Sequence, residues 1–503
     1  GMRGKSLMIQ GTGSSVGKSV LCAALLRILR QDGYRVAPFK AQNMALNSFA
    51  TREGLEMGRA QVVQAQAAGI EPSVMMNPVL LKPTSDRRSQ VVVNGRPIGN
   101  MTAMEYHTYK PALRKMIQET YEALERTVDY VVIEGAGSPA EINLREGDIV
   151  NMSMAHTADA PVLLVGDIDP GGVFASLFGT VMLLPPEERA RIKGTIINKF
   201  RGDVKILEPG LRMIEDLIGV PTAGVVPWTD IELEDEDSVT GRFHRAAGEG
   251  DVDVAVVHLP HISNFTDFQA LSLVEGARVR YAKRPEELEN ADVVILPGTK
   301  NTIEDLLSIR NRGLDAAILR HARAGKLLIG VCGGYQMLAG KLSDPHHVES
   351  RVVETAGLGL LDMDVQFLPD NATVQAAGVV TGGDCWLSAI DGAQIDGYEI
   401  HAGVNRPGVG AVPWLRLTSR EGIDGVRNAQ GNVLGSYLHG LFDNGHLSRA
   451  IIEHVRRKRG LPAQGGAPLT MEAFREREFD RLADIVRASL DMDFIYSVMR
   501  GDL

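Results

Sequence analysis

The sequence predicts an α/β protein in which a P-loop parallel-sheet domain, with helices on both faces, is followed by a second α/β domain. Three observations carry this prediction. Apolar strand-like runs alternate with helical stretches in both halves, a glycine-rich loop ending in Gly17-Lys18-Ser19 follows the first run, and Cys332 lies between glycines after an apolar run at 326–330. At 503 residues the chain is too long for one ordinary core.

Six apolar runs in the first half have the length and composition of buried strands. We expect these strands at residues 6–9, 34–38, 130–133, 161–165, 194–197 and 222–226. Residues 18–31 and 113–126 between them have helical spacing. Alternation of this kind is typical of a parallel sheet covered by helices on both faces.

The second half begins with four more expected strands, at residues 252–259, 278–282, 293–296 and 327–331. Four later runs, at 365–367, 374–380, 414–417 and 433–437, have no long helices between them, so we expect antiparallel hairpins there. Residues 447–459 and 471–499 look helical. We therefore predict a first domain at 1–229, an acidic and then Gly/Ala-rich linker at 230–250, a second domain at 251–445, and a helical extension of that second half at 446–503.

Composition excludes several functional classes. The apolar fraction of 44% and charged fraction of 23% are ordinary for a globular protein, and a net charge of −10 argues against nucleic acid or anionic membrane as the main partner. The three cysteines, Cys22, Cys332 and Cys385, form no Cys-x-x-Cys pair, so neither a disulfide framework nor a thiolate zinc site is indicated. No secretory pattern or membrane-length apolar stretch is found, and we expect a cytoplasmic protein.

The loop after the first expected strand has the pattern of a phosphate-binding loop. In it Gly13 and Gly17 would let backbone N–H groups surround phosphates, Lys18 would contact the terminal phosphates, and Ser19 would ligate Mg²⁺. The spacing departs from the usual motif, because Thr12 occupies the place of the first glycine. The alternative is a plain glycine turn, but Gly-Lys-Ser in this context favours a nucleotide.

Polar side chains end three other expected strands of this sheet. Glu134 is suited to a second metal contact, Asp167 and Asp169 end another strand, and Asn198 follows a third. Each alone would fit a solvated strand end or a helix cap. Together they should line the sheet edge at which ligands bind in such folds.

Cys332 is a candidate nucleophile. Glycines on both sides permit a tight strand-to-helix turn that lifts the thiol clear of the sheet, and a helix N-terminus would favour the thiolate. The alternative reading of a lone cysteine is a small buried hydrophobe. Its glycine-flanked place at a strand end favours the nucleophile.

Longer motifs resemble a known family. The phosphate loop, Glu134-Gly-Ala-Gly and Asn198-Lys-Phe-Arg resemble the dethiobiotin synthetase type of ATP-dependent ligase, and further motifs resemble the cobyric acid synthase family over both halves. These further motifs are Lys40-Ala-Gln-Asn43-Met, Gly58-Arg-Ala-Gln61, Asn77-Pro-Val-Leu-Leu-Lys82 and Asp167-Ile-Asp in the first half, and Cys332-Gly-Gly-Tyr-Gln-Met, Gly397-Tyr-Glu-Ile-His401 and Ser436-Tyr-Leu-His439-Gly in a part that resembles class I glutaminases.

The resemblance implies ATP- and glutamine-dependent amidation of the b, d, e and g carboxylates of adenosylcobyrinic acid a,c-diamide, giving adenosylcobyric acid in cobalamin biosynthesis. It implies ATP, Mg²⁺, glutamine and a corrinoid as ligands, and leaves a homo-oligomer open. The alternatives are the sister cobyrinic acid a,c-diamide synthase, and a partitioning-type switch ATPase whose glutaminase half is inactive. The early phosphate-loop lysine typical of such switch ATPases is missing here.

In the glutaminase half, the resemblance makes Cys332 the nucleophile and His439 the general base and then acid, with Gly333 and Gly298 as oxyanion-hole residues. His401 is the second choice for the histidine, with a structural or glutamine-positioning role equally open. Many related glutaminases carry a glutamate where this chain has Leu441. The group that orients the imidazole therefore stays open among a backbone carbonyl, a water and a distant acid.

In the synthetase half, the resemblance gives Lys18, Ser19 and Glu134 the binding of Mg-ATP, and Lys40 the neutralisation of charge on the phosphoryl group. Asn198 would face the adenine. Asn43 and Asp148 are candidates for positioning substrate or metal, and a surface loop acid is the alternative for Asp148. Where the family usually has an arginine, this chain has Pro170, so no arginine contact is expected there.

Overall fold

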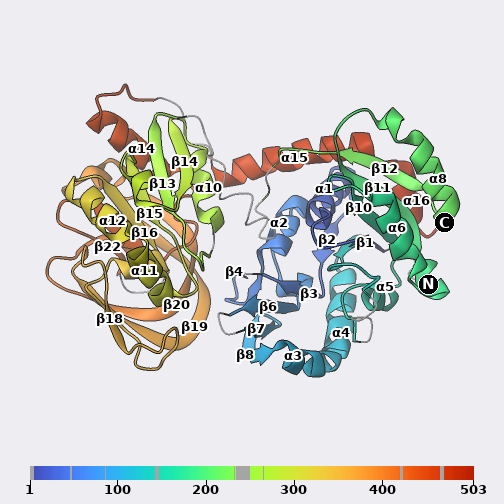
Figure 1. Ribbon diagram of the computed structural model, residues 1–503, viewed down its shortest axis with the longest axis horizontal. Helices are drawn as coiled ribbons and strands as arrows, with labels where there is room; N and C mark the ends of the chain where they lie inside the picture. The colour runs from blue at the N-terminus through green and yellow to red at the C-terminus, as the bar shows by residue number, and fades with distance from the viewer. Residues whose placement is uncertain are drawn as a thin grey trace. The chain divides into compact units, whose positions relative to one another are not determined.

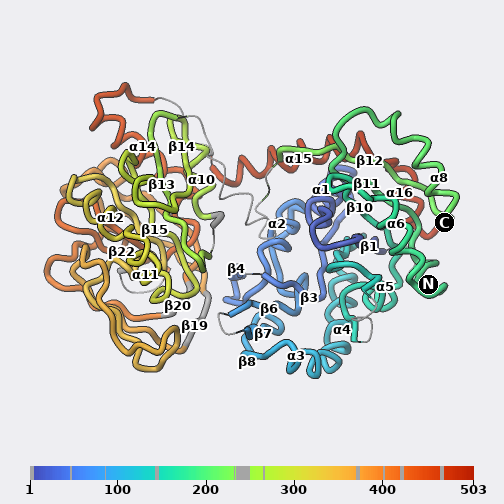
Figure 2. Tube along the Cα trace, viewed as in Figure 1, coloured from blue at the N-terminus to red at the C-terminus, as the bar shows by residue number. Residues whose placement is uncertain are grey.

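The computed structural model describes residues 5–45, 48–84, 87–141, 147–231, 233, 250–263, 265–419, 423–464 and 470–503. The chain forms two compact units, shown in Figures 1 and 2. The first comprises Gly1–Thr51, Leu55–Asp237 and Arg475–Leu503, and the second comprises Arg52–Gly54 and Ser238–Phe474. Most of the expected linker at 230–250 lies outside the described residues.

The first unit is built on a six-stranded parallel sheet. Its strand order is β12 (Thr222–Pro227), β11 (Ile192–Phe200), β10 (Val162–Asp167), β1 (Ser6–Gly11), β9 (Tyr130–Glu134) and β2 (Val36–Phe39). All six strands were expected from the sequence, with ends that differ by a few residues. Because parallel strands place their carboxyl ends on one edge, Glu134, Asp167 and Asn198 lie along the same edge as the loop after β1.

Helices cover both faces of this sheet, as predicted. One buried core joins the sheet to α4 (Arg114–Glu125), α5 (Met152–Ala158), α6 (Val173–Met182) and α8 (Glu208–Ile218). The opposite core joins it to α1 (Lys18–Gln31), α15 (Met471–Ser489) and α16 (Met492–Met499), and α2 (Arg59–Ala68) contributes to both cores. A short α7 (Pro186–Arg189) precedes β11.

The C-terminal helices correct our domain assignment. We expected residues 446–503 to extend the second half, and α14 (His446–Lys458) does pack in the second unit. In contrast, Phe479 of α15 and Ile495 of α16 are buried in the first unit with Leu7 and Ile9 of β1. An amphipathic pattern shows that a helix has an apolar face, but it does not identify the surface that this face covers.

The described part of residues 42–109 contains a mixed sheet, a hairpin and a helix that the sequence analysis did not predict. It contains a four-stranded sheet of β3 (Gln42–Met44), β6 (Val79–Pro83), β7 (Arg88–Val93) and β8 (Arg96–Thr102), a hairpin of β4 (Ser48–Ala50) and β5 (Glu56–Gly58), and α3 (Ala103–Tyr109). Several of these strands have only three residues, which is too short for a clear period-2 pattern. This segment follows β2 and carries Asn43.

The second unit has a mixed sheet. Its parallel part runs in the order β14 (Ala277–Ala282), β13 (Val252–Val257), β15 (Val293–Leu296), β16 (Leu327–Val331) and β23 (Val433–Ser436). The sheet continues through β22 (Ile423–Arg427), β21 (Val412–Leu417), β19 (Met363–Val380), β17 (Lys341–Ser343) and β18 (Glu354–Ala356), with β20 (Gln394–Pro407) antiparallel to β19. The expected strands 365–367 and 374–380 are one strand, β19, with a register break, and β20 and β22 were not predicted.

Helices also cover both faces of the parallel part of the second sheet. On one face lie α11 (Thr302–Asn311), α12 (Leu314–Arg323) and α13 (Gly333–Met337), and on the other lie α10 (Gln269–Ser272) and α14. Cys332 follows β16 and His439 follows β23 closely, and these two strands are parallel neighbours. Among the described helices, none has the length and hydropathy needed to cross a bilayer.

Candidate active sites

Cys332 occupies a strained turn between β16 and α13, as its flanking glycines predict. Its φ of 52° and ψ of −114° are unusual for a residue other than glycine. Gly334 allows α13 to lie against the sheet, because a Cβ there would be 2.0 Å from the carbonyl oxygen of Leu296. The helix has only five residues, so its dipole is small. A nucleophilic role for this thiol therefore depends on a neighbouring charge more than on the helix.

His439 supplies that charge. Its Nε2 lies 2.8 Å from Cys332 Sγ, and its Nδ1 lies 2.7 Å from Asp267 Oδ2. The His439 and Asp267 side chains are 1% and 4% exposed. Burial lowers the pKa of His439, but the charges of Cys332 and Asp267 outweigh burial and raise this pKa to about 10. The geometry therefore places an imidazolium, held by the Asp267 carboxylate, next to the sulfur of Cys332.

Asp267 is the residue that the sequence analysis missed. It lies in the one-turn segment Phe265–Phe268 after β13, 172 positions before His439, and it also accepts a hydrogen bond from the backbone N–H of Gly440. Of the three options left open for orienting the imidazole, the distant acid is the one present. Leu441, at the position where related glutaminases carry glutamate, is instead buried in the core. Asp267 and His439 are far apart in the sequence, and only the tertiary fold brings them into contact. No spacing between the two residues could therefore have predicted the pair.

Tyr398 of β20 gives the Gly397-Tyr-Glu motif a place in the site. Its ring stacks on the His439 imidazole, with ring centroids 5.1 Å apart and planes inclined by 28°. The backbones of these two residues also exchange hydrogen bonds of 3.1 and 2.9 Å. The side chain of His401, our second choice for the histidine, lies outside the described residues.

The two predicted oxyanion-hole residues lie beside the nucleophile. A Cβ on Gly298 would be 3.2 Å from His439 Cε1, and one on Gly333 would be 2.5 Å from Thr299 Cγ2. The turn after β15, which carries Gly298, therefore contacts both the histidine and the residue after the thiol. An oxyanion-hole role for Gly298 and Gly333 stays a prediction.

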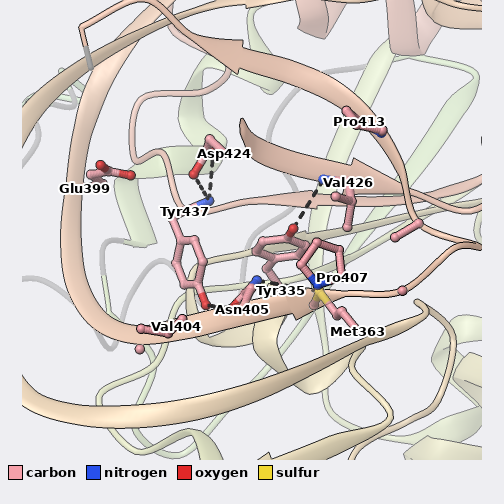
Figure 3. Close-up of a pocket in the computed structure, with 13 residues that line it drawn as sticks. Tyr335, Met363, Glu399, Val404, Asn405, Pro407, Pro413, Asp424, Val426 and Tyr437 are labelled. Carbon is pink, nitrogen blue, oxygen red and sulfur yellow. Dashed lines mark hydrogen bonds between the residues drawn. The ribbon is translucent and has the colours of Figure 1, made fainter. Parts of the chain in front are cut away.

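A cavity of about 360 Å³ adjoins this site (Figure 3). The Tyr437 carbonyl oxygen lies 3.4 Å from Cys332 Sγ, and the Tyr437 side chain lines the cavity. Its hydroxyl group donates to Asn405 Oδ1, and two buried carboxylates, Glu399 and Asp424, also line the space. A cavity with a few convergent polar groups suits a small polar ligand.

In the first unit, the phosphate loop has the predicted local structure. Gly17 has a φ of 96°, and a Cβ there would collide with the Asn198 side chain at 2.3 Å. The Lys18 Nζ donates to the carbonyl oxygens of Gly13 and Gly137, at 2.7 and 3.3 Å. Asn198 Nδ2 donates to the Val16 carbonyl oxygen at 2.9 Å, so this amide supports the loop, and contact with adenine stays a prediction.

Several polar groups lie around the carboxylate of Glu134 at the carboxyl end of β9. Its Oε1 accepts a hydrogen bond from Ser19 Oγ at 2.6 Å and lies 3.7 Å from Lys40 Nζ, while its Oε2 accepts one from Gln64 Nε2 at 2.9 Å. These hydroxyl and carboxylate oxygens fit Mg²⁺, which binds through one or two carboxylates together with substrate phosphates. In the described part of the chain, no cluster of three or more acidic, histidine or cysteine side chains is placed to hold a metal ion.

The two candidates for positioning substrate or metal differ in their surroundings. Asn43 is buried, and its Nδ2 donates to Gln61 Oε1 at 2.8 Å; Gln61 Nε2 in turn lies 3.4 Å from Glu134 Oε2, so Asn43 is linked to the predicted metal carboxylate. Asp148 instead accepts hydrogen bonds from the backbone N–H groups at 150, 151 and 153, at the start of α5. The structure thus gives Asp148 a helix-capping role, and a ligand role for it stays a prediction.

Comparisons with known proteins match a domain family to each half of the chain. A family model described as CobQ/CobB/MinD/ParA nucleotide binding domain matches residues 7–238, and a CobB/CobQ-like glutamine amidotransferase domain matches 253–447. The cobyric acid synthases of Alkaliphilus metalliredigens and Yersinia enterocolitica are 51% and 52% identical to this chain; each match covers 98% of this chain, and 100% and 98% of the respective relative. The chain belongs to the cobyric acid synthase family.

Membership of the cobyric acid synthase family confirms several predictions from the sequence. The α/β fold with a nucleotide-binding domain and a glutaminase-like domain is confirmed, as is an enzyme of the glutamine amidotransferase ligase class. A Clostridium botulinum cobyric acid synthase is also 52% identical, with 98% of this chain and 99% of that protein covered. The match therefore includes both halves in one polypeptide.

Proposed function

We propose that this protein uses ATP and glutamine to amidate the b, d, e and g carboxylates of adenosylcobyrinic acid a,c-diamide, giving adenosylcobyric acid in cobalamin biosynthesis. The observation that carries the proposal is that a chain of the cobyric acid synthase family contains both a Cys332–His439–Asp267 site and a phosphate loop with Ser19 against Glu134. One site suits release of nitrogen from an amide, and the other suits activation of an acid.

In the glutaminase half, the Cys332 thiolate attacks the side-chain carbonyl carbon of glutamine. Backbone N–H groups near Gly298 and Gly333 stabilise the resulting oxyanion. The imidazolium of His439 gives its proton to the departing nitrogen, so ammonia leaves and a thioester remains. His439 then takes a proton from water, which attacks the thioester and releases glutamate and the thiolate. Throughout, Asp267 holds Nδ1, so that Nε2 faces the sulfur.

In the synthetase half, a carboxylate oxygen of the corrinoid attacks the γ-phosphorus of ATP, and ADP leaves. Ammonia then attacks the acyl carbon of the acyl phosphate, and inorganic phosphate leaves with formation of the amide. Lys18 and the loop backbone bind the phosphates, and Lys40 neutralises charge near Glu134. Ser19 and Glu134 would hold Mg²⁺, which supplies charge neutralisation when bound.

Two alternative functions fit less well. The sister cobyrinic acid a,c-diamide synthase has the same two halves, but the relatives at 51–52% identity over 98% of this chain carry the name cobyric acid synthase. A switch ATPase with an inactive glutaminase half does not need a buried imidazolium next to a thiol. An assay of ammonia incorporation into both corrinoids distinguishes the two synthases.

Cys332→Ala tests the division of labour. This variant is expected to lose glutamine-dependent amidation and to keep amidation from free ammonium, because the nucleophile does not take part in acid activation. Cys385→Ala, a change of another partly exposed cysteine of the second unit, is the matched control and should keep both activities. Loss of the ammonium-dependent reaction in Cys332→Ala, with normal unfolding behaviour, contradicts the proposed division.

A further inference from the structure

Asp305 of α11 is a buried carboxylate outside the Cys332–His439–Asp267 site. It has 0% exposed surface, and its carboxylate binds two separate loops. Its Oδ2 accepts hydrogen bonds from Thr299 Oγ1 at 2.5 Å and from the His261 backbone N–H at 3.1 Å, while its Oδ1 lies 2.7 Å from His261 Nδ1. The carboxylate therefore links the loop after β13 to the turn after β15.

The turn after β15 is the one that carries the predicted oxyanion-hole residue Gly298. Two backbone hydrogen bonds join it to the loop after β13, one from Ser263 N–H to the Gly298 carbonyl oxygen at 2.9 Å and one from Lys300 N–H to the His261 carbonyl oxygen at 3.0 Å. Gly298 lies against His439, and Thr299 Cγ2 lies where a side chain on Gly333 would be. A displacement of this turn would thus move backbone groups on one side of Cys332.

We propose that Asp305 is a positioning residue for the oxyanion hole of the glutaminase site, acting through the Thr299 hydroxyl group to hold the 298–299 backbone in place. This inference rests on the proposed glutaminase function of Cys332. The described partners of Asp305 are His261 and Thr299, and they include neither the Cys332 thiol nor the His439 imidazole. Its effect on the reaction therefore passes through the turn after β15.

The physical reason is geometric. An oxyanion hole acts only if its N–H groups are fixed before the negative oxygen forms, and loss of one such donor costs roughly 10²–10³-fold in kcat. Loss of an interaction that is equally strong in the ground state and the transition state changes KM. A misplaced oxyanion donor instead weakens binding of the transition state, so it lowers kcat. A hydrogen bond to a carboxylate is roughly twice as strong as one between neutral groups, so the bond from Thr299 to the buried Asp305 restrains the turn after β15.

The first test is glutamine hydrolysis by Asp305→Asn, with Glu304→Gln as the control. Glu304 is the adjacent acid of α11, is half-exposed, and has its Oε2 atom 3.5 Å from Nε2 of His261. Asp305→Asn is expected to lower kcat by about 10–100-fold, less than full loss of a donor, with KM changed by less than about threefold. Iodoacetamide alkylates Cys332 without forming an oxyanion, so the rate of this alkylation should be the same in Asp305→Asn as in the wild type.

The second test is the pair Thr299→Val and Thr299→Ser. Valine has a similar shape but no hydroxyl group, so it should lower kcat as Asp305→Asn does, and the double variant should be no worse than either single one. Serine keeps the hydroxyl group and should restore most of kcat. The inference is overturned if kcat is equal in the wild type and Asp305→Asn, or if the losses of kcat in Asp305→Asn and Thr299→Val add up in the double variant. Slower alkylation of Cys332 in Asp305→Asn also overturns it. Failure of the wild type to hydrolyse glutamine contradicts the proposed function instead.

Discussion

Replacement of Asp267 by asparagine tests the charge arrangement of the glutaminase site. The substitution keeps the size of the side chain and removes its negative charge 2.7 Å from His439 Nδ1. Because the charge of Asp267 is one of the causes that raise the pKa of His439 to about 10, this pKa should fall in the variant. As the pH rises, His439 of the variant therefore loses the proton that it gives to the departing nitrogen at a lower pH than in the wild type.

The size of the effect follows from the burial of the pair. His439 and Asp267 are 1% and 4% exposed, so water scarcely replaces the lost interaction. A hydrogen bond to a charged group contributes about 1.5–3 kcal/mol. Since about 1.4 kcal/mol corresponds to a factor of ten in rate, kcat for glutamine hydrolysis should fall by about 10- to 150-fold.

The assay is glutamate release as a function of pH. In the wild type, the alkaline decline should lie near the raised pKa of His439, about 10, and in Asp267→Asn it should move to lower pH together with the fall in kcat. Asp396→Asn, which removes an exposed carboxylate from the strand that carries Tyr398, is the control and should change neither quantity. An unchanged alkaline limb with unchanged kcat in Asp267→Asn refutes the reasoning.

Two further predictions concern the first unit. Lys18→Ala should remove ATP-dependent amidation from either nitrogen source while glutamine hydrolysis by the second unit persists, as measured by phosphate and glutamate release; normal amidation would disprove the phosphate-loop assignment. Phe479→Ala should lower the free energy of unfolding of the first unit by about 3–5 kcal/mol, as measured by urea denaturation, because Phe479 is fully buried with the core of β1. Arg477→Ala, a change of an exposed residue on the same helix within the first unit, should have little effect on the free energy of unfolding.

Local patterns in the sequence predicted the parts of the fold that rest on buried parallel strands. The six strands of the first sheet and the first four of the second are long apolar runs, and their period and flanking glycines identify them without any tertiary contact. The three-residue strands between β2 and α3, and the strands β20 and β22, escaped prediction. The three-residue strands are too short to show a period of two, and β20 and β22 gain strand structure from pairing with β19 and β21.

The sequence by itself predicted a phosphate loop at Lys18 and Ser19, a carboxylate at the end of the strand that carries Glu134, and the thiol of Cys332 in a glycine turn. Each of these motifs depends on backbone conformation and residue types within a few positions of the chain. The tertiary structure alone decided that Asp267 orients His439, that Asp148 caps a helix, and that α15 and α16 complete the core of the first unit. Such contacts join residues far apart along the chain, and only the packing of buried surfaces brings them together.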